Sequence, residues 1–203
     1  MNLPLPAEDE GKKMNGKQRF RPVPGREVRV AISGRSGCGN TTVSRLLAET
    51  LGVTLINYTF RNIAAETGVS LADILEKAKT DFSYDKTVDT RQVELARQGS
   101  CVLGSRLAIW MLPEADLKVF LSASPRVRAE RILRREGGTL EEILRFTEMR
   151  DQADSARYQE LYRINNQDIS AADLVVDTEQ ELPEAIVGRI TEVLLERGLI
   201  APV

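Results

Sequence analysis

Residues 28–48 read VRVAISGRSGCGNTTVSRLLA, in which a short apolar run, a glycine-rich turn and an amphipathic run follow one another. Gly34 and Gly39 are five residues apart, and Thr41 follows, which is the spacing of a phosphate-binding loop, G-x-x-x-x-G-K-[S/T]. The lysine of that pattern is replaced by Asn40. Such a lysine reaches the β- and γ-phosphates of a bound nucleotide. The sequence therefore predicts a cradle for nucleotide phosphates that lacks its usual cation.

The residues on either side of the loop make this signal specific. Residues 28–32 form a β-branched run typical of a strand that is buried on both faces. Residues 41–51 place apolar side chains at helical spacing, and Gly52 is suited to end the helix. The free N–H groups and the dipole at a helix N-terminus favour an anion. A strand–turn–helix with incidental glycines is the alternative, and the order of the elements argues against it.

Composition bounds the possible functions. The chain has 203 residues, which suits one domain, and a net charge of −2, which argues against a nucleic-acid partner. It has no histidine, which excludes Ser-His-Asp and Cys-His catalysis. Cys38 and Cys101 are far apart, make no metal signature and suit a reducing cytoplasm. No apolar stretch suggests a signal peptide or a membrane partner.

Strands alternate with helices along the chain, which is typical of an α/β fold with a parallel sheet. We expect five strands, at residues 28–32, 53–57, 100–103, 117–121 and 174–176. We expect helices at residues 41–51, 60–66, 71–78, 88–98, 125–136, 140–162 and 183–197. Residues 1–26 are polar and rich in Pro, Gly and Lys, so they are expected to form a flexible tail. Residues 27–203 are expected to form a single domain.

Arginines gather on two of the expected helices. Arg131 and Arg135 are four residues apart and share a face. Arg150, Asp154 and Arg157 also share a face. One interpretation is a surface ladder of salt bridges, which contributes little to stability. The other is a pair of guanidinium forks that grip phosphate, and the preceding phosphate loop favours it, because phosphoryl transfer depends on positioned cations.

The chain resembles the cytidylate kinases, especially the short form typical of archaea, over about residues 28–196. The resemblance rests on the segments AISGRSGCGNTTVSRLLAE, DTRQVELARQG, CVLGSRLAIWML, DLKVFLSASPRVRAERILRREG, RDQADSARY and ADLVVDT. RDQADSARY is the most specific, since R-D-x-x-D-x-x-R just before the last strand is characteristic of that family. The resemblance implies a P-loop NTPase three-layer α/β fold with a five-stranded parallel sheet. It also implies an acceptor-binding helical region at residues 58–99 and a lid at residues 131–150.

The resemblance assigns roles to individual residues. The ATP-binding residues would be Gly34, Arg35, Ser36, Gly37, Cys38, Gly39, Asn40, Thr41 and Thr42, with Thr41 also facing the Mg²⁺ cofactor. The CMP-binding residues would be Arg61, Arg106, Asp154 and Arg157, with Asp154 reading the cytosine amino edge or the sugar. The catalytic arginines would be Arg131 and Arg135 in the lid, and Arg150 and Arg157 as a phosphate-contacting pair.

The implied reaction moves the γ-phosphoryl group of ATP to CMP, and to dCMP, in a monomeric enzyme. Two positions depart from the family pattern: Asn40 replaces the lysine, and Gly104 and Ser105 stand where an acidic residue and a glycine are usual. Losing one such electrostatic contact costs on the order of 10²–10³ in rate. We therefore expect reduced activity, with Arg35 as the nearest substitute cation and an increase in kcat on Asn40→Lys. The alternatives are a weak or inactive nucleotide-binding protein on the same fold, and a P-loop kinase for another small molecule.

Overall fold

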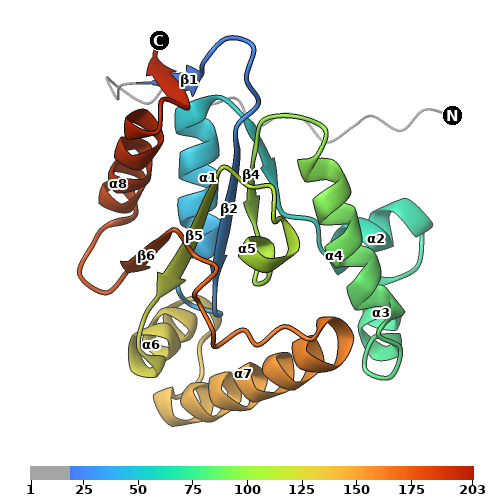
Figure 1. Ribbon diagram of the computed structural model, residues 1–203. Helices are drawn as coiled ribbons and strands as arrows, with labels where there is room; N and C mark the ends of the chain where they lie inside the picture. Colours follow the sequence, from blue (N-terminus) through green and yellow to red (C-terminus); the bar gives the residue numbers. More distant parts are fainter. Residues whose placement is uncertain (1–18) are drawn as a thin grey trace, which may run out of the picture.

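The computed structural model describes residues 19–203, which are built around a five-stranded parallel sheet with the strand order β3-β4-β2-β5-β6 (Figure 1). The strands are β2 (Arg29–Gly34), β3 (Thr54–Ile56), β4 (Cys101–Gly104), β5 (Leu117–Ser122) and β6 (Leu174–Asp177). All five predicted strands and the α/β class are confirmed. In the register of the sheet, Val30 of β2 pairs with Val102 of β4 and with Leu117 of β5. The loop after β2 therefore emerges at the middle of the carboxyl edge of the sheet.

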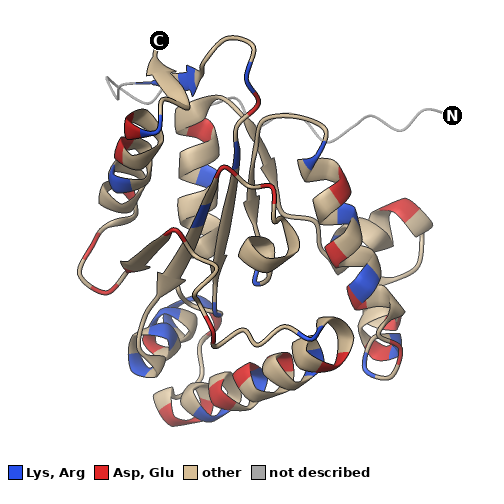
Figure 2. Ribbon diagram, in the orientation of Figure 1, with Lys and Arg blue, Asp and Glu red and all other residues tan. Residues whose placement is uncertain are grey.

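Helices cover both faces of the sheet and its carboxyl edge (Figure 1). One face carries α1 (Asn40–Leu51) and α8 (Pro183–Glu196), and the other carries α4 (Ser83–Ala96) and α5 (Ala108–Met111). Beyond α4 lie α2 (Phe60–Thr67) and α3 (Leu71–Lys77), while α6 (Pro125–Glu136) and α7 (Leu140–Tyr162) lie below the carboxyl edge. Figure 2 shows that the charged residues lie mainly on the helices and loops, whereas the strands are mostly uncharged.

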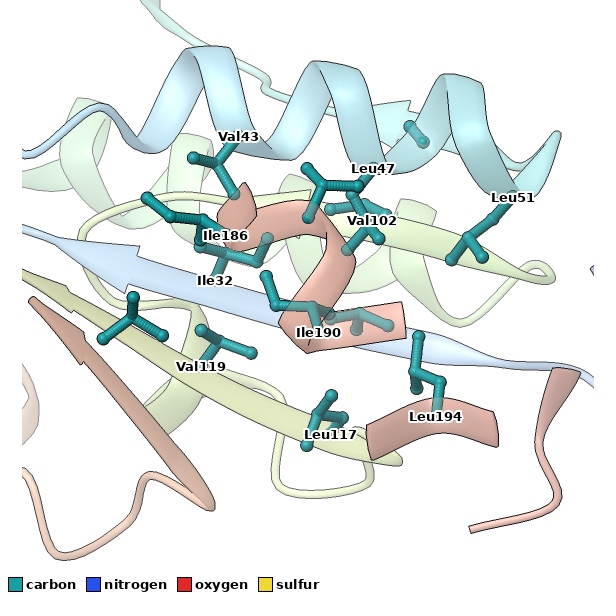
Figure 3. Close-up of a cluster of buried hydrophobic side chains, with 14 of the residues drawn as sticks. Ile32, Val43, Leu47, Leu51, Val102, Leu117, Val119, Ile186, Ile190 and Leu194 are labelled. Atoms are coloured by element: carbon teal, nitrogen blue, oxygen red, sulfur yellow. The ribbon is translucent and has the colours of Figure 1, made fainter. Parts of the chain in front are cut away.

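The larger hydrophobic core joins α1 and α8 to the sheet (Figure 3). Ile32 of β2, Leu47 of α1 and Ile190 of α8 are completely buried within it. A smaller core on the opposite face holds Leu103 and Ile109. Each fully buried side chain of this size contributes about 1.5–3 kcal/mol. The two cores hold the sheet in place beneath the loops at its carboxyl edge.

Two helices differ from the sequence prediction. Helix α4 begins at Ser83 rather than at residue 88. Its first turns carry no apolar periodicity, because their inward face lines a cavity instead of the core. Helix α5 was not predicted, since its four residues are too few to show a helical period.

The chain also contains a two-stranded antiparallel sheet, formed by β1 (Phe20–Pro22) and β7 (Ile200–Pro202). The predicted flexible tail of residues 1–26 is therefore wrong for residues 20–22, and residues 1–18 of that tail lie outside the described residues. Phe20 packs against the larger core, and its partner strand lies at the far end of the chain, so no local pattern signals the pairing. No helix within residues 19–203 combines the length and apolar character needed to span a membrane.

Candidate active site

The glycine-rich loop joins the end of β2 to the start of α1. A Cβ atom added to Gly34 would lie 2.8 Å from the carbonyl oxygen of Leu121 in β5. At Gly37, which has a φ of +85°, a Cβ atom would lie 2.7 Å from the carbonyl oxygen of Arg128 in α6. Both positions therefore need glycine because β5 and α6 pack directly on the loop. The loop is held closely by its neighbours.

Two arginines of α6 donate hydrogen bonds to carbonyl groups of this loop. Arg128 Nη1 donates to the carbonyl of Ser36 at 3.1 Å, and Arg131 Nη1 donates to that of Gly37 at 3.3 Å. Arg128 is only 2% exposed and makes a two-pronged ion pair with Asp151 of α7, with Nη–Oδ distances of 3.3 and 2.6 Å. With its carbonyls engaged, the loop keeps its amide groups, and those of the first turn of α1, for a phosphate. Arg128 and Asp151 were not predicted as site residues.

Asn40, at the position of the missing lysine, is turned toward the sheet. Its Nδ2 donates to the carbonyl of Ile32 at 2.9 Å and to that of Ser105 at 3.2 Å. Its Oδ1 accepts from Ser44 Oγ at 2.9 Å. Asn40 therefore ties the first turn of α1 to the ends of β2 and β4, and it supplies no charge to the loop.

Asp154 is a buried carboxylate between two arginines. Arg106 Nη1 lies 3.1 Å from its Oδ2, and Arg157 Nη2 donates to its Oδ1 at 2.6 Å. Arg150, the other arginine expected to flank Asp154, makes no ion pair with it, whereas Arg106, which follows β4, does. Arg106 Nη2 also donates to Ser36 Oγ at 3.0 Å. Burial acts to lower the pKa of Arg106, but the Asp154 carboxylate together with Tyr158 and Asp151 raises that pKa by more. Arg106 thus joins the phosphate loop to the acceptor region.

The remaining predicted arginines differ in their surroundings. Arg131 donates to Thr178 Oγ1 at 2.8 Å as well as to the loop, so it is not a solvated lid residue. Arg135 pairs with Glu136 at the surface. Arg150 makes no ion pair within residues 19–203, and partial burial, followed by the charge of Arg106, lowers its pKa. Arg131 and Arg150 line the cavity and make no ion pair with a carboxylate of the described residues, which suits them to an anionic ligand.

A cavity of about 1300 Å³ brings most of the predicted residues together. The predicted residues that line it are Gly34, Arg35, Ser36, Gly37, Cys38, Gly39, Asn40, Thr41, Thr42, Arg106, Arg131, Arg135, Arg150, Asp154 and Arg157. Arg61 does not line it, because its exposed side chain projects from α2 outside the cavity. The Cys38 side chain packs in the core beneath the loop, and burial raises its pKa.

Sequence reasoning missed further cavity residues. Asp85 and Asp89 line the cavity from α4. Sequence reasoning missed them because acidic side chains do not contribute to the apolar periodicity by which a helix is recognised. Four of the exposed large apolar residues also line it, a pattern that the sequence alone does not reveal. These are Leu75, Phe146, Met149 and Leu182. Exposed apolar side chains gathered around a polar cavity are typical of a site that holds flat, partly apolar ligands.

The residues at the loop fit a magnesium ion that is held mainly by phosphate oxygens. Thr41 lies in the first turn of α1, is exposed to the cavity and makes no side-chain hydrogen bond within residues 19–203. Within the same residues there is no group of three or more His, Cys, Asp or Glu side chains able to hold a metal. Mg²⁺ commonly keeps several waters and uses few protein ligands beside the phosphates. One hydroxyl group is consistent with that arrangement.

A phosphate loop after the central strand, facing arginines across one cavity, defines a P-loop phosphotransferase. Solved structures with this fold include shikimate kinase from Acinetobacter baumannii, with a TM-score of 0.59 and 21% identity over 84% of this chain and 94% of that one. Deoxyadenosine kinase from M. mycoides has a TM-score of 0.54 and 18% identity over 82% and 99% of the two chains. At these identities the likeness concerns the fold, which is the predicted P-loop fold.

Sequence comparison gives the family. Residues 29–180 match the cytidylate kinase-like family. Cytidylate kinase 2 of Borreliella burgdorferi is 42% identical over 85% of this chain and 98% of that protein. The cytidylate kinase of Pyrococcus horikoshii is 38% identical over 81% and 86%. The chain belongs to the cytidylate kinase-like family, and the predicted family and kinase class are confirmed.

Proposed function

We propose that this protein transfers the γ-phosphoryl group of ATP to CMP, and also to dCMP, with Mg²⁺ as cofactor. One observation carries the proposal: the phosphate loop and the acceptor carboxylate share one cavity, and Arg106 bonds to both through Ser36 and Asp154. A residue that contacts both sites lies where a phosphoryl group would pass between them. The relatives named cytidylate kinase support CMP as the acceptor.

On the donor side, the amides of the loop and of the first turn of α1 hold the β- and γ-phosphates. Thr41 would hold Mg²⁺, which would supply charge neutralisation on those phosphates when bound. Arg131 and Arg150 supply the positive charge that Asn40 lacks, since neither makes an ion pair within the described residues. Arg35 is less suited to this role, because its guanidinium lies 3.5 Å from the Asp151 carboxylate.

On the acceptor side, Arg106 and Arg157 hold the monophosphate, and Asp154 orients both guanidinium groups. An oxygen of the acceptor phosphate attacks the γ-phosphorus of ATP. The bond from that phosphorus to the bridging oxygen of ADP breaks, so ADP leaves and CDP forms. The arginines stabilise charge on the transferring group, which is the main contribution a protein makes to phosphoryl transfer.

Residues 131–150 are proposed to act as the lid. Gly137 and Gly138 both have positive φ, so the connection between α6 and α7 can change its backbone angles without Cβ strain. Closure would bring Arg135 and Arg150 toward the phosphates. Hydrogen exchange at residues 126–150 is expected to slow when CMP and a non-hydrolysable ATP analogue are added together. Equal exchange at saturating ligand would contradict the lid.

A coupled assay with ATP, Mg²⁺ and each of CMP, dCMP, UMP and AMP tests the function. We expect ADP formation that depends on CMP or dCMP and exceeds that with the other nucleotides. CMP binding without turnover would support the alternative of an inactive nucleotide-binding protein. Phosphorylation of another small molecule, but of none of these nucleotides, would support the alternative of a P-loop kinase for that molecule. We further propose a monomer that acts in a reducing compartment such as the cytoplasm, which fits the two buried free cysteines, Cys38 and Cys101.

A further inference from the structure

Both carboxylate oxygens of Asp154 are engaged by arginines, so this residue has little capacity left to read a base. Other acceptors line the same cavity along one face of α4. Asp85, Asp89 and Gln92 are spaced four and three residues apart, and all three line the cavity. Helix α7 also lines the cavity, with Phe146 and other residues at helical spacing. The cavity therefore has a second polar wall that the phosphate chemistry does not use.

Asp89 is the best-placed acceptor on this wall. Tyr162, at the end of α7, donates its hydroxyl to Oδ2 of Asp89 at 2.7 Å. Within residues 19–203, the other oxygen of Asp89 makes no hydrogen bond. The charged and titratable groups around Asp89 are Asp85 on its own helix, Tyr162 and Arg157 on α7, and Arg106 after β4. One oxygen of a carboxylate that is held in place is thus left for a ligand.

The neighbours of Asp89 on α4 complete the wall. Asp85 Oδ1 lies 3.4 Å from Arg157 Nη1, and its Oδ2 is buried without a partner within the described residues. Gln92 is buried, and its Nε2 donates to the carbonyl of Tyr58 at 2.8 Å, which fixes the amide. Val88 lies on the same face, and the exposed Leu75 of α3 also lines the cavity. Apolar side chains beside fixed acceptors suit the plane and the edge of a nucleobase.

We propose that Asp89, positioned by Tyr162, reads the base of the acceptor nucleotide by accepting a hydrogen bond from an exocyclic amino group, and so selects cytosine over uracil. The inference rests on the proposed function and deepens it. Cytosine carries an amino donor where uracil carries a carbonyl acceptor. An ionised carboxylate can only accept. Uracil would therefore place two acceptors against each other, which leaves buried polar groups unpaired and lowers its affinity.

The protonation state of Asp89 makes this selectivity depend on pH. Burial raises the pKa of Asp89 to about 6. Above that pH the carboxylate is ionised and rejects the uracil carbonyl, whereas below it the carboxyl group can donate to that carbonyl. Selectivity for CMP over UMP should therefore fall as the pH drops through 6. The two nucleotides carry the same phosphate, so titration of the phosphate cancels in the ratio.

The test measures kcat/KM for CMP and for UMP, one pH unit above and one below 6, in the wild type, Asp89→Asn and Glu94→Gln. An asparagine amide can donate to uracil as well as accept from cytosine. We expect Asp89→Asn to lower the CMP-to-UMP ratio at the higher pH about tenfold or more, and to remove its pH dependence. Glu94 lies on α4 outside the cavity and pairs with Arg91, so its variant should keep the wild-type ratio.

Calorimetric titration with CMP and with UMP repeats the comparison without turnover, and Tyr162→Phe provides a second variant. Tyr162→Phe should lower the ratio less than Asp89→Asn does, because the carboxylate remains. An unchanged ratio in Asp89→Asn, in both kinetics and binding, overturns the base-reading role even if CMP is phosphorylated. If no nucleotide is phosphorylated, but CMP binds selectively and Asp89→Asn loses this selectivity, only the proposed function is overturned.

Discussion

A Cβ atom added to Gly104 would lie 3.0 Å from Oδ1 of Asn40 and 2.6 Å from Oγ of Ser44. The asparagine in the phosphate loop and the glycine at the end of β4 therefore belong to one arrangement. Read along the sequence, they are two separate departures from a family pattern. In the fold they touch, and the small residue makes room for the hydrogen bonds of the polar one.

This contact reverses the expectation that Asn40→Lys raises kcat. A lysine would lose the hydrogen bonds to the carbonyls of Ile32 and Ser105 and would leave Ser44 without its acceptor. We expect Asn40→Lys to lower both kcat and stability, the latter by about 1–3 kcal/mol. Initial rates with ATP and CMP, together with urea unfolding, measure both effects. A higher kcat at unchanged stability would show that the ammonium group reaches the phosphates after all.

Gly104→Ala should destabilise the protein by about 1–3 kcal/mol, because the new methyl group overlaps the Ser44 side chain. Gly188→Ala is the matched control. Gly188 lies inside α8 with nothing within 4 Å of an added Cβ, so alanine there should stabilise the helix by about 0.5–1 kcal/mol. Thermal unfolding of the two variants gives the comparison, and equal shifts would argue against the crowded site.

Arg106→Lys should lower kcat about 10²-fold, because a single ammonium cannot bond to Ser36 and Asp154 with the geometry of a planar fork. Arg45→Lys provides the control, since Arg45 lies exposed on α1 and pairs with Glu49 of the same helix. Steady-state rates at saturating ATP and CMP measure the effect. If Arg106→Lys matches the control variant, Arg106 has no role between the two sites.

Asp151→Asn should destabilise the protein by about 3 kcal/mol, because Arg128 is buried and would lose its carboxylate. The phosphate loop rests on Arg128, so ATP binding should weaken as well. Glu130→Gln removes an exposed ion pair with Arg126 and should change stability by less than about 1 kcal/mol. Urea unfolding and ATP titration of both variants test the difference, and similar losses would contradict it.

Asp89→Asn should stabilise the unliganded protein above pH 6. The folded-state pKa, raised to about 6 from 3.8, means that the folded protein binds this proton more tightly than the unfolded chain does. Stability is therefore lost as the pH rises between these values, and the full cost of the charge remains above them. Removing that charge should add on the order of 1–3 kcal/mol above pH 6 and little below pH 4. An equal difference in unfolding free energy between Asp89→Asn and the wild type at both pH values would contradict this.

The sheet and the phosphate loop could be predicted from sequence because their signals are local. Residues 28–32 are β-branched and adjoin a glycine loop at fixed spacing, and each feature follows from neighbouring residues alone. Strand β1 could not be predicted, because its pairing depends on β7 at the other end of the chain.

In the candidate site, too, local spacing could be predicted from sequence and long-range contacts could not. Helical spacing placed Asp154 and Arg157 on one face, and they bond to each other. It also placed Arg150 on that face, but the second partner of Asp154 is Arg106, which the sheet brings from a distant part of the chain. Asp85 and Asp89 escaped notice because a polar face that lines a cavity resembles a solvated face in sequence.

The pairing of β1 with β7 brings the two ends of the described chain together, and the amide of Val203 donates to the carbonyl of Arg19 at 3.0 Å. A short linker could therefore join residue 203 to residue 19, and the chain could be reopened elsewhere as a circular permutant. Opening it between Gly137 and Gly138 would leave both cores and the phosphate loop on continuous chain while cutting the link between α6 and α7. Such a permutant would separate what the covalent connection contributes to catalysis from what the arginines on either side contribute.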